Sequence, residues 1–314
     1  MTFSVNDSPL CGEDGKFLTS SMIRERLFKE VETNVAITVR VTEENTFEVS
    51  GRGELQLGVL IESMRREGFE LSVSPPQVVF QKNETGLLEP IEEVIIDSDT
   101  EFSGIVIEKL SQRKAEFKEM IEYGAKSRLI FEMPTRGLLG YMGEFKNDTH
   151  GTGVLNHLFL RYEEHKGKLE RSRKGALISS AAGQTNAYAL EGIEPRGILF
   201  IGPNSKVYPG MIIGEHNRDN DLEVNPAKAK QLSNVRTVFK EDAIRLTPPK
   251  SMSLEETIAY CSGNFLVVDK VLIRAEDERI EVTPKAIRLR KKELDANKRA
   301  SARRKEKNMY ANKN

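Results

Sequence analysis

Residues 1–80 alternate between the two-residue period of strands and the longer period of helices. Apolar residues at every second position predict four strands, near 3–5, 37–41, 47–49 and 69–73. Apolar residues three and four positions apart predict two helices, over 19–31 and 54–67. Two helices on one face of a four-stranded antiparallel sheet form a ferredoxin-like βαββαβ unit.

The turn before the second helix is Gly51-Arg52-Gly53. Two glycines let the backbone turn sharply and approach a neighbour closely. A glycine-rich turn that opens a helix can also hold a phosphate on free N–H groups, and Arg52 would add a charge-assisted contact. From spacing alone, a solvated turn residue is the commoner explanation for Arg52.

Residues 81–165 repeat this order of elements with a different sequence. We expect a strand over 90–96, a helix over 102–117, a hairpin of 120–123 with 128–133, a weak helix over 138–145, and a strand over 155–159. The second helix is weak because Gly140 and Gly143 each cost about 1 kcal/mol relative to alanine. These elements predict a second ferredoxin-like domain.

Beyond the basic linker 166–174 the chain changes character. Short apolar runs punctuated by glycine and proline predict a β-rich domain, with runs at 176–179, 187–190, 198–201 and 211–213. Ser253 and Glu256 have capping-box spacing for a helix. The expected fold is therefore α+β: ferredoxin-like domains at 1–80 and 81–165, then a β-rich mixed domain at 166–314.

Composition indicates a globular chain, with 38% hydrophobic and 30% charged residues among 314. No apolar run approaches the roughly 18 residues that span a bilayer. No signal-peptide pattern opens the sequence, so we expect a cytoplasmic location and no membrane partner. The net charge is −1, but residues 285–310 hold eleven Lys or Arg against three acids. This asymmetry predicts a basic arm that meets a polyanion, with a solvated charged tail as the alternative.

Candidate catalytic and metal-binding residues do not group. His150, His157, His165 and His216 fall in different predicted elements, without a second ligand type at metal spacing. The two cysteines, Cys11 and Cys261, lack the company expected of a nucleophile. We therefore predict no active site and no metal site in this chain.

Basic and amide side chains make a better case. Lys and Arg can contact phosphates, and Asn can bond sugar hydroxyls or base edges. The candidate RNA-binding residues are Arg218, Asn220, Lys228, Lys230, Asn234, Arg236, Arg245, Arg288, Arg290, Lys291 and Lys292. From charge alone, a mobile surface loop with ordinary charges explains the first seven equally well.

Several motifs resemble a known family. The run Gly51-Arg52-Gly53-Glu54-Leu55-Gln56-Leu57 resembles the third domain of translational GTPases of the elongation factor G class. Residues 134–141 (Pro-Thr-Arg-Gly-Leu-Leu-Gly-Tyr) and the region after Lys166 resemble the ribosome-associated BipA (TypA) family within that class. The resemblance covers essentially the whole chain and implies domain III at 1–80, domain V at 81–165, and the BipA-type C-terminal domain at 166–314. Residues 263–281 look longer than is usual in the family.

This resemblance implies a ribosome-binding part of a translational GTPase that works in ribosome assembly and in stress or cold adaptation. Its implied partners are ribosomal RNA and A-site tRNA; Lys230, Asn234 and Arg236 are the best candidates for the tRNA contact, and Arg52 and Arg136 are candidates for ribosome contact. We expect a monomer.

The sequence contains no phosphate loop and no guanine-reading motif. We therefore expect this chain neither to bind nor to hydrolyse GTP, with GTP and magnesium belonging to a nucleotide-binding domain outside it. The alternative function is a protein-interaction module that docks on basic ribosomal proteins.

Overall fold

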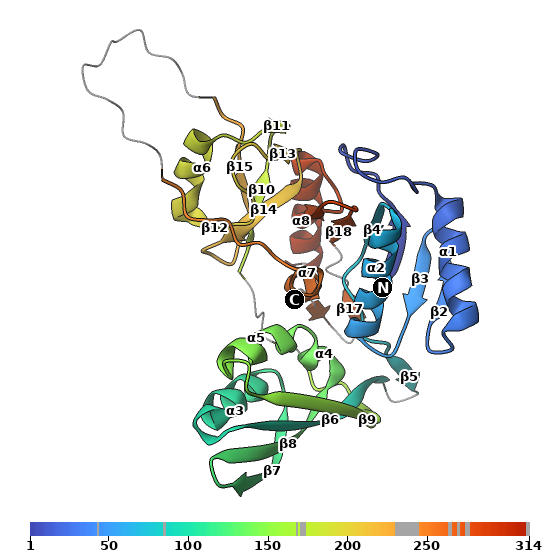
Figure 1. Ribbon diagram of the computed structural model, residues 1–314, viewed down its shortest axis with the longest axis vertical. Helices are drawn as coiled ribbons and strands as arrows, with labels where there is room; N and C mark the ends of the chain where they lie inside the picture. Colours follow the sequence, from blue (N-terminus) through green and yellow to red (C-terminus); the bar gives the residue numbers. More distant parts are fainter. Residues whose placement is uncertain are drawn as a thin grey trace.

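The structure, a computed structural model, contains two large β-sheets with helices packed against them (Figure 1). One sheet has ten strands and combines the two ends of the chain, and the other has five strands from its middle. The described residues are 1–42, 44–83, 86–167, 169, 174–229, 245–262, 266–268, 271–273 and 277–311, with the backbone alone at 262, 266–268, 271–273, 303 and 305–311.

The N-terminal unit has the predicted order of elements. These are β1 (Thr2–Val5), α1 (Ser20–Thr33), β2 (Thr38–Val41), β3 (Phe47–Ser50), α2 (Glu54–Glu67) and β4 (Leu71–Val73). The strands lie in the order β4-β1-β3-β2 with antiparallel neighbours, so the ferredoxin-like prediction is confirmed. The Thr19 hydroxyl caps α1 by accepting from the Met22 amide at 3.4 Å. Gly68, at φ 102°, ends α2 in the left-handed conformation that glycine favours.

The middle unit is also ferredoxin-like. It contains β6 (Gly86–Asp99), α3 (Ser103–Gln112), β7 (Glu116–Tyr123), β8 (Lys126–Pro134), α4 (Thr135–Leu138), α5 (Tyr141–Asp148) and β9 (Val154–Glu164), with β5 (Gln81–Asn83) added to β6. The order β9-β6-β8-β7 repeats that of the first unit.

Two boundaries in the middle unit differ from the prediction. The helix expected to reach Phe117 ends at Gln112, because Lys114 adopts φ 68° and the chain reverses into β7. Phe117 then packs edge-on against Phe131 at 5.5 Å rather than lying on a helix. The weak second helix is divided into α4 and α5 by Gly140, whose φ is 73°.

The C-terminal part supplies the remaining six strands of the ten-stranded sheet. Its strands are β10 (Ala176–Ser179), β11 (Gly183–Gln184), β12 (Gly197–Leu199), β13 (Lys206–Val207), β14 (Met211–His216), β15 (Leu222–Val224), β16 (Leu266–Val268), β17 (Val271–Ile273), β18 (Glu278–Val282) and β19 (Ile287–Lys291). Of these, β10, β12, β14, β15, β18 and β19 belong to the ten-stranded sheet, and β11 with β13 and β16 with β17 form two small separate sheets. Its helices are α6 (Ala187–Ile193), α7 (Leu254–Ser262) and α8 (Ala296–Ala311). The strand expected at 187–190 is wrong: the Asn186 side chain caps α6 by accepting from the Ala189 amide at 2.8 Å.

A single sheet joins the first and last parts of the chain. β18 pairs antiparallel with β4, which places Ile280 beside Val73 and Val282 beside Leu71. All four residues belong to one core cluster that contains residues of both parts. The prediction of separate domains at 1–80 and 166–314 therefore needs qualification, since the two segments share a sheet and a hydrophobic core.

The middle unit meets both other parts at the two glycine turns. Glu54, at the start of α2, accepts a hydrogen bond from the Gly140 amide at 3.4 Å. A Cβ on Gly140 would lie 3.2 Å from the Ala259 carbonyl oxygen of α7, so this turn is closely packed. Among the described residues, no helix is both long enough and apolar enough to cross a membrane.

Candidate nucleic-acid interface

Three exposed basic residues lie on adjacent backbone segments beside the large sheet. The Gly175 amide donates to the Arg218 carbonyl at 2.8 Å, and the Asn217 amide donates to the Arg196 carbonyl at 2.9 Å. The side chains of Lys174, Arg196 and Arg218 are exposed. Within the described ranges, no acidic group forms an ion pair with them. We call them the basic cluster, which can approach phosphates with little desolvation cost.

Arg218 of this cluster is one of the predicted RNA-binding residues, whereas Lys174 and Arg196 are not. Lys174 closes the basic linker, which the sequence indicates only as a spacer. Arg196 follows Glu194-Pro195 in a short turn without any pattern of its own. Neither residue carries a local signal; the pairing of β12 with β14 brings Arg196 beside Arg218.

The other candidate RNA-binding residues between 220 and 245 differ in what the structure shows of them. The Asn220 carbonyl accepts from the His216 ring at 2.6 Å and its amide donates to the Asp221 carbonyl at 3.4 Å, so Asn220 shapes a turn. Lys228 and Arg245 are exposed. Lys230, Asn234 and Arg236 lie outside the described residues.

The predicted basic arm is wrong for residues 287–291, because they form β19 in the interior of the large sheet. Arg290 is 3% exposed and pairs with Asp7, and Lys291 is 1% exposed. The prediction that these two side chains contact RNA phosphates conflicts with this burial. Lys292 is exposed, so a contact between Lys292 and RNA phosphate stays a prediction.

Lys291 is enclosed by carboxylates. Its Nζ lies 3.0 Å from Asp221, 2.8 Å from Asp277 and 2.9 Å from Glu278. Burial by itself lowers the pKa of Lys291, but Glu278 and the two aspartates outweigh this effect and hold the pKa well above its ordinary value. Lys291 is therefore a charged structural residue.

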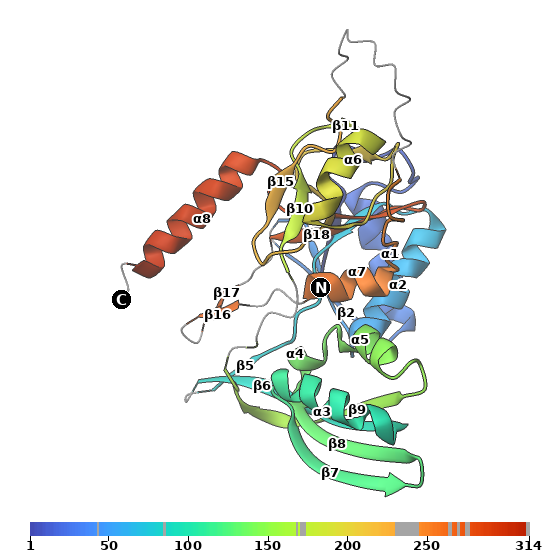
Figure 2. The ribbon, with the colours of Figure 1, turned by 90° about the vertical axis from the view of Figure 1, so that its left-hand side faces the viewer.

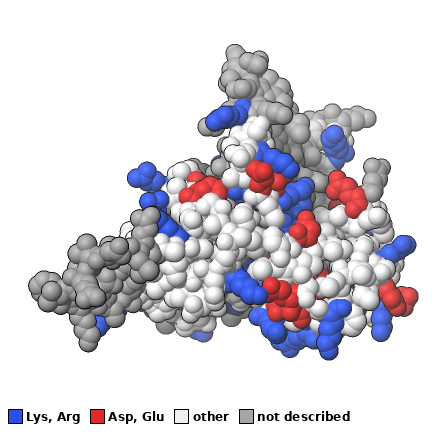
Figure 3. Space-filling view, turned by 90° about the horizontal axis from the view of Figure 1, so that it is seen from above, with Lys and Arg blue, Asp and Glu red and all other residues white. Residues whose placement is uncertain are grey.

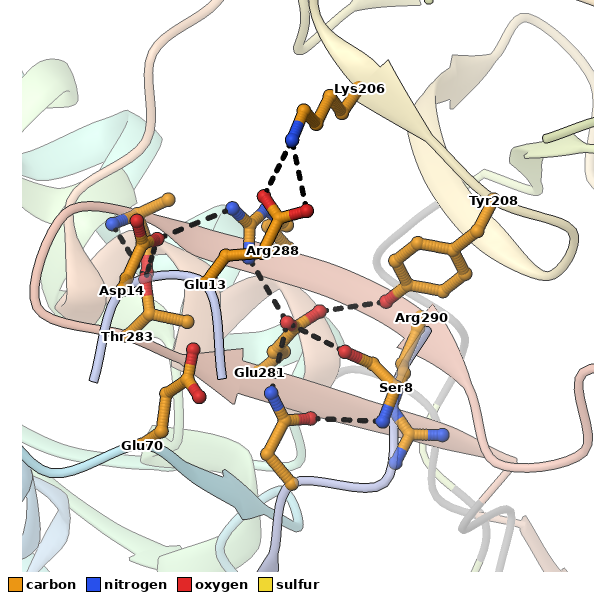
Figure 4. Close-up of polar contacts among 12 residues, drawn as sticks. Ser8, Glu13, Asp14, Glu70, Lys206, Tyr208, Glu281, Thr283, Arg288 and Arg290 are labelled. Atoms are coloured by element: carbon orange, nitrogen blue, oxygen red, sulfur yellow. Dashed lines mark hydrogen bonds and ion pairs between the residues drawn. The ribbon is translucent and has the colours of Figure 1, made fainter. Parts of the chain in front are cut away.

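Arg288 takes part in a buried network that holds the N-terminal loop to the C-terminal part (Figure 4). The fully buried Glu281 carboxylate accepts from Asn6 at 3.0 Å, Ser8 at 2.8 Å and Tyr208 at 2.7 Å. Arg288 completes the network at 3.0 Å from Glu281. Burial and the Glu281 charge raise the pKa of Tyr208 well above its ordinary range, which keeps it a hydrogen-bond donor.

The two proposed ribosome contacts differ in the structure. Arg136 is buried and forms an ion pair with the fully buried Glu89 at 2.5 Å. Its surface role is therefore contradicted. Arg52 is exposed, and its amide donates to the Gln56 side chain at 2.8 Å. Its guanidinium has no ion pair among the described residues.

The surface as a whole has mixed charge. Figure 3 shows basic and acidic side chains interspersed on the face seen from above, without one continuous basic area. Helix α8 extends away from the rest of the chain (Figure 2). Arg299 fixes its start by donating to the carbonyls of Glu293 and Leu294, both at 2.7 Å. Across the part of the chain that the structure describes, no group of His, Cys, Asp and Glu could hold a metal ion.

Comparison with known proteins identifies two family domains. Residues 174–296 match the TypA/BipA C-terminal domain, and residues 86–173 match the elongation factor G C-terminus. These matches agree with the resemblances of the middle unit and of the region after Lys166.

Curated relatives match nearly the whole chain. The large ribosomal subunit assembly factor BipA of Bacillus subtilis is 45% identical over 310 residues, which are 98% of this chain and 48% of that protein. The protein of that name from Synechocystis is 44% identical over 293 residues, 93% of this chain and 47% of that protein. The Salmonella typhimurium protein is 44% identical over 307 residues, 97% of this chain and 48% of that protein. The chain thus spans about half the length of the curated relatives it matches.

Proposed function

Because this chain belongs to the TypA/BipA family, we propose that it takes part in assembly of the large ribosomal subunit and binds that subunit through ribosomal RNA. The observation that carries the proposal is the 45% identity to the Bacillus subtilis assembly factor over 98% of this chain. GTP hydrolysis, in this proposal, belongs to the half of the relatives that the chain does not span. Such a role would be carried out in the cytoplasm.

The basic cluster is the described surface best suited to RNA phosphates. Lys174, Arg196 and Arg218 are exposed and are not neutralised by ion pairs within the described ranges. Each phosphate contact releases condensed counterions, so binding through these residues should weaken steeply as salt rises. Arg52, Lys228, Arg245 and Lys292 are exposed and can add contacts.

A-site tRNA is a finer version of the same proposal. Exposed Lys228 and Arg245 lie at the two ends of the segment that holds Lys230, Asn234 and Arg236. A chain that reaches tRNA through this segment could act on assembled ribosomes under stress or in the cold. Binding to large subunits does not depend on this extension.

Docking on ribosomal proteins is a second candidate function, and the middle unit favours it. β9 is an edge strand that pairs with β6 and leaves Leu158 63% and Phe159 58% exposed. Exposed apolar side chains on an edge strand are typical of interaction surfaces. Contact through this strand would depend little on salt.

Co-sedimentation with purified large subunits across a salt series tests the proposal. The test variant is Lys174→Ala with Arg196→Ala and Arg218→Ala, and the matched control replaces the exposed Lys29, Lys126 and Lys146 by alanine. Each lost phosphate contact should reduce the slope of log affinity against log salt by roughly 0.7–0.9. We expect this loss in the test variant, with the control close to wild type.

A contrary result would identify the second candidate. If the test variant and the control have equal affinities and slopes, the basic cluster does not contact RNA. If Phe159→Ser then abolishes a salt-independent interaction, the chain docks through protein. If the wild-type chain does not sediment with large subunits at low salt, the proposed function is wrong.

A further inference from the structure

Strand β14 changes its neighbour along one edge of the large sheet. Among the described strands, one edge of β14, from Ile212 to Glu215, pairs with β10 alone. On the opposite edge, Gly214 to His216 pair with β12, whereas Met211 and Ile212 pair with β19. β12 and β19 thus reach the same edge of β14 from opposite ends and must separate where they meet. A break in sheet pairing of this kind leaves room for a ligand.

A cavity of about 350 Å³ lies at this separation, within the roughly 300–1,000 Å³ usual for ligand sites. We call it the wedge cavity. Its apolar lining includes Phe200, Ile201, Met252 and Ile287. The Phe200 ring is half-buried and lies edge-on to Tyr260 at 5.4 Å, so neighbouring packing fixes its orientation.

Three cations, Lys206, Lys250 and Arg288, also line the wedge cavity, and none of the described residues that line it carries a carboxylate. Arg288 is already neutralised by Glu281 at 3.0 Å and Asp14 at 3.5 Å (Figure 4). Lys250 is exposed and has no ion pair within the described ranges. It is therefore the cation most available to an incoming anion.

Lys206 is available at low cost. Its Nζ lies 2.9 Å from Glu13, but the two side chains are 63% and 40% exposed. Water and salt screen an exposed pair of this kind, so it contributes little to stability and a phosphate can displace Glu13. In Figure 4 Lys206 extends from its strand toward Glu13, above the Arg288 and Glu281 network.

We propose that the wedge cavity binds one nucleotide, as an unpaired residue of an RNA strand or as a free nucleoside monophosphate. The base lies against Phe200 and its apolar neighbours, and the phosphate lies between Lys250 and Lys206. Unpaired bases stack on aromatic side chains while lysines contact the phosphate. An acidic peptide would satisfy the lysines but would leave the aromatic surface without a planar partner. The RNA source rests on the proposed function.

Fluorescence anisotropy with a labelled hexamer of adenylate, in buffer without magnesium, measures this binding. AMP, an RNA duplex and a glutamate hexapeptide serve as competitors. We expect Lys250→Ala to weaken hexamer binding about fivefold, and Ile201→Trp, which fills the cavity, to weaken it at least as much. Glu13→Gln should strengthen it about two- to threefold, because it removes the carboxylate that competes with phosphate. Lys29→Ala is the matched control and should have no effect.

The competitors identify the source of the ligand. Displacement by AMP supports the site for either source, whereas hexamer binding that AMP displaces poorly assigns it to RNA. Competition by the duplex or the glutamate peptide as effective as that by unlabelled adenylate hexamer would overturn the nucleotide assignment. So would unchanged binding in both Lys250→Ala and Ile201→Trp, provided that their circular dichroism spectra match wild type.

The two experiments distinguish failure of the wedge-cavity assignment from failure of the proposed function. If the chain sediments with large subunits but binds neither hexamer nor AMP, the wedge-cavity assignment falls and the assembly role stands. If it binds the hexamer through Lys250 but does not sediment with large subunits, the wedge-cavity assignment stands and the assembly role fails.

Discussion

Arg136→Ala should strongly destabilise the middle unit, although the family resemblance makes Arg136 a candidate for ribosome contact. Arg136 is 7% exposed and Glu89 is fully buried, and Arg136 Nε and a terminal guanidinium nitrogen lie 2.5 Å and 3.3 Å from its two carboxylate oxygens. Arg136 also donates to the Gly167 carbonyl at 2.6 Å. Removing the guanidinium leaves the Glu89 charge with the Lys166 amide, which donates to it at 2.6 Å.

The expected loss is about 3–5 kcal/mol, the cost of leaving one charge of a buried pair without its partner. The hydrogen bond from the Lys166 amide to Glu89 remains in the variant, so the loss of stability should lie near the lower end of this range. With a urea slope of about 1–3 kcal/mol per molar, the unfolding midpoint should fall by about 1–3 M. Urea is the appropriate denaturant because, unlike guanidinium, it does not screen charges.

Arg128→Ala is the matched control on the same sheet. Arg128 binds Asp97 through two nitrogens, at 2.7 Å and 2.9 Å, but the two side chains are 43% and 34% exposed, so solvent screens the pair and its loss should cost far less than that of the buried pair. Replacing Glu89 and Arg136 together by methionine should cost less than Arg136→Ala, because no buried charge remains. If Arg136→Ala loses no more stability than Arg128→Ala, the buried-pair reasoning is refuted.

Three further predictions follow from particular positions. Gly53→Val should cost less than about 1 kcal/mol in urea unfolding, because Gly53 is an extended N-cap (φ −173°) and an added Cβ meets nothing within 4 Å; a larger loss would reveal a contact absent from the structure. Glu92 lies 2.6 Å from His157 and raises the pKa of that imidazole. The ion pair stabilises the fold fully below the unfolded pKa of about 6.5, and this stabilisation is lost as pH rises through the higher folded pKa. His157→Gln should therefore lower the free energy of unfolding by up to about 1 kcal/mol at pH 5.5 and by almost nothing at pH 9. A loss that does not depend on pH would contradict this sign. Truncation after Asp295, which removes α8, should leave the circular dichroism melting temperature almost unchanged, whereas truncation after Pro284 should abolish cooperative melting because it also removes β19; equal behaviour of the two truncations would argue against β19 as an interior strand.

Hydrophobic periodicity predicts the order of strands and helices in both ferredoxin-like units. In the first unit, buried Phe47 and Val49 alternate with exposed neighbours, and Leu57, Ile61 and Met64 form the buried stripe of α2. These patterns are local, because the side chains that repeat on one face must all find the same core. Helix ends follow local chemistry too, as at Gly68.

Periodicity fails where a different local preference competes with it. The apolar run at 187–190 fits a strand as well as a helix, and the Asn186 cap decides for the helix. Charge patterns fail for another reason. A run of basic residues has the same composition whether it is solvated or paired, so the burial of Arg290 and Lys291 cannot be predicted from it.

Long-range pairing is decided only by the tertiary structure. Asn6 reaches Glu281 across 275 positions, Arg136 reaches Glu89 across 47, and β18 joins β4 so that two expected domains share one sheet. The basic cluster and the wedge cavity arise in the same way, from strands that become neighbours on folding. The sequence determines which face of each helix or strand must be buried. Which strand pairs with which depends on strand edges and on single polar groups, and the fit between two such edges or groups leaves no periodic signal in the sequence.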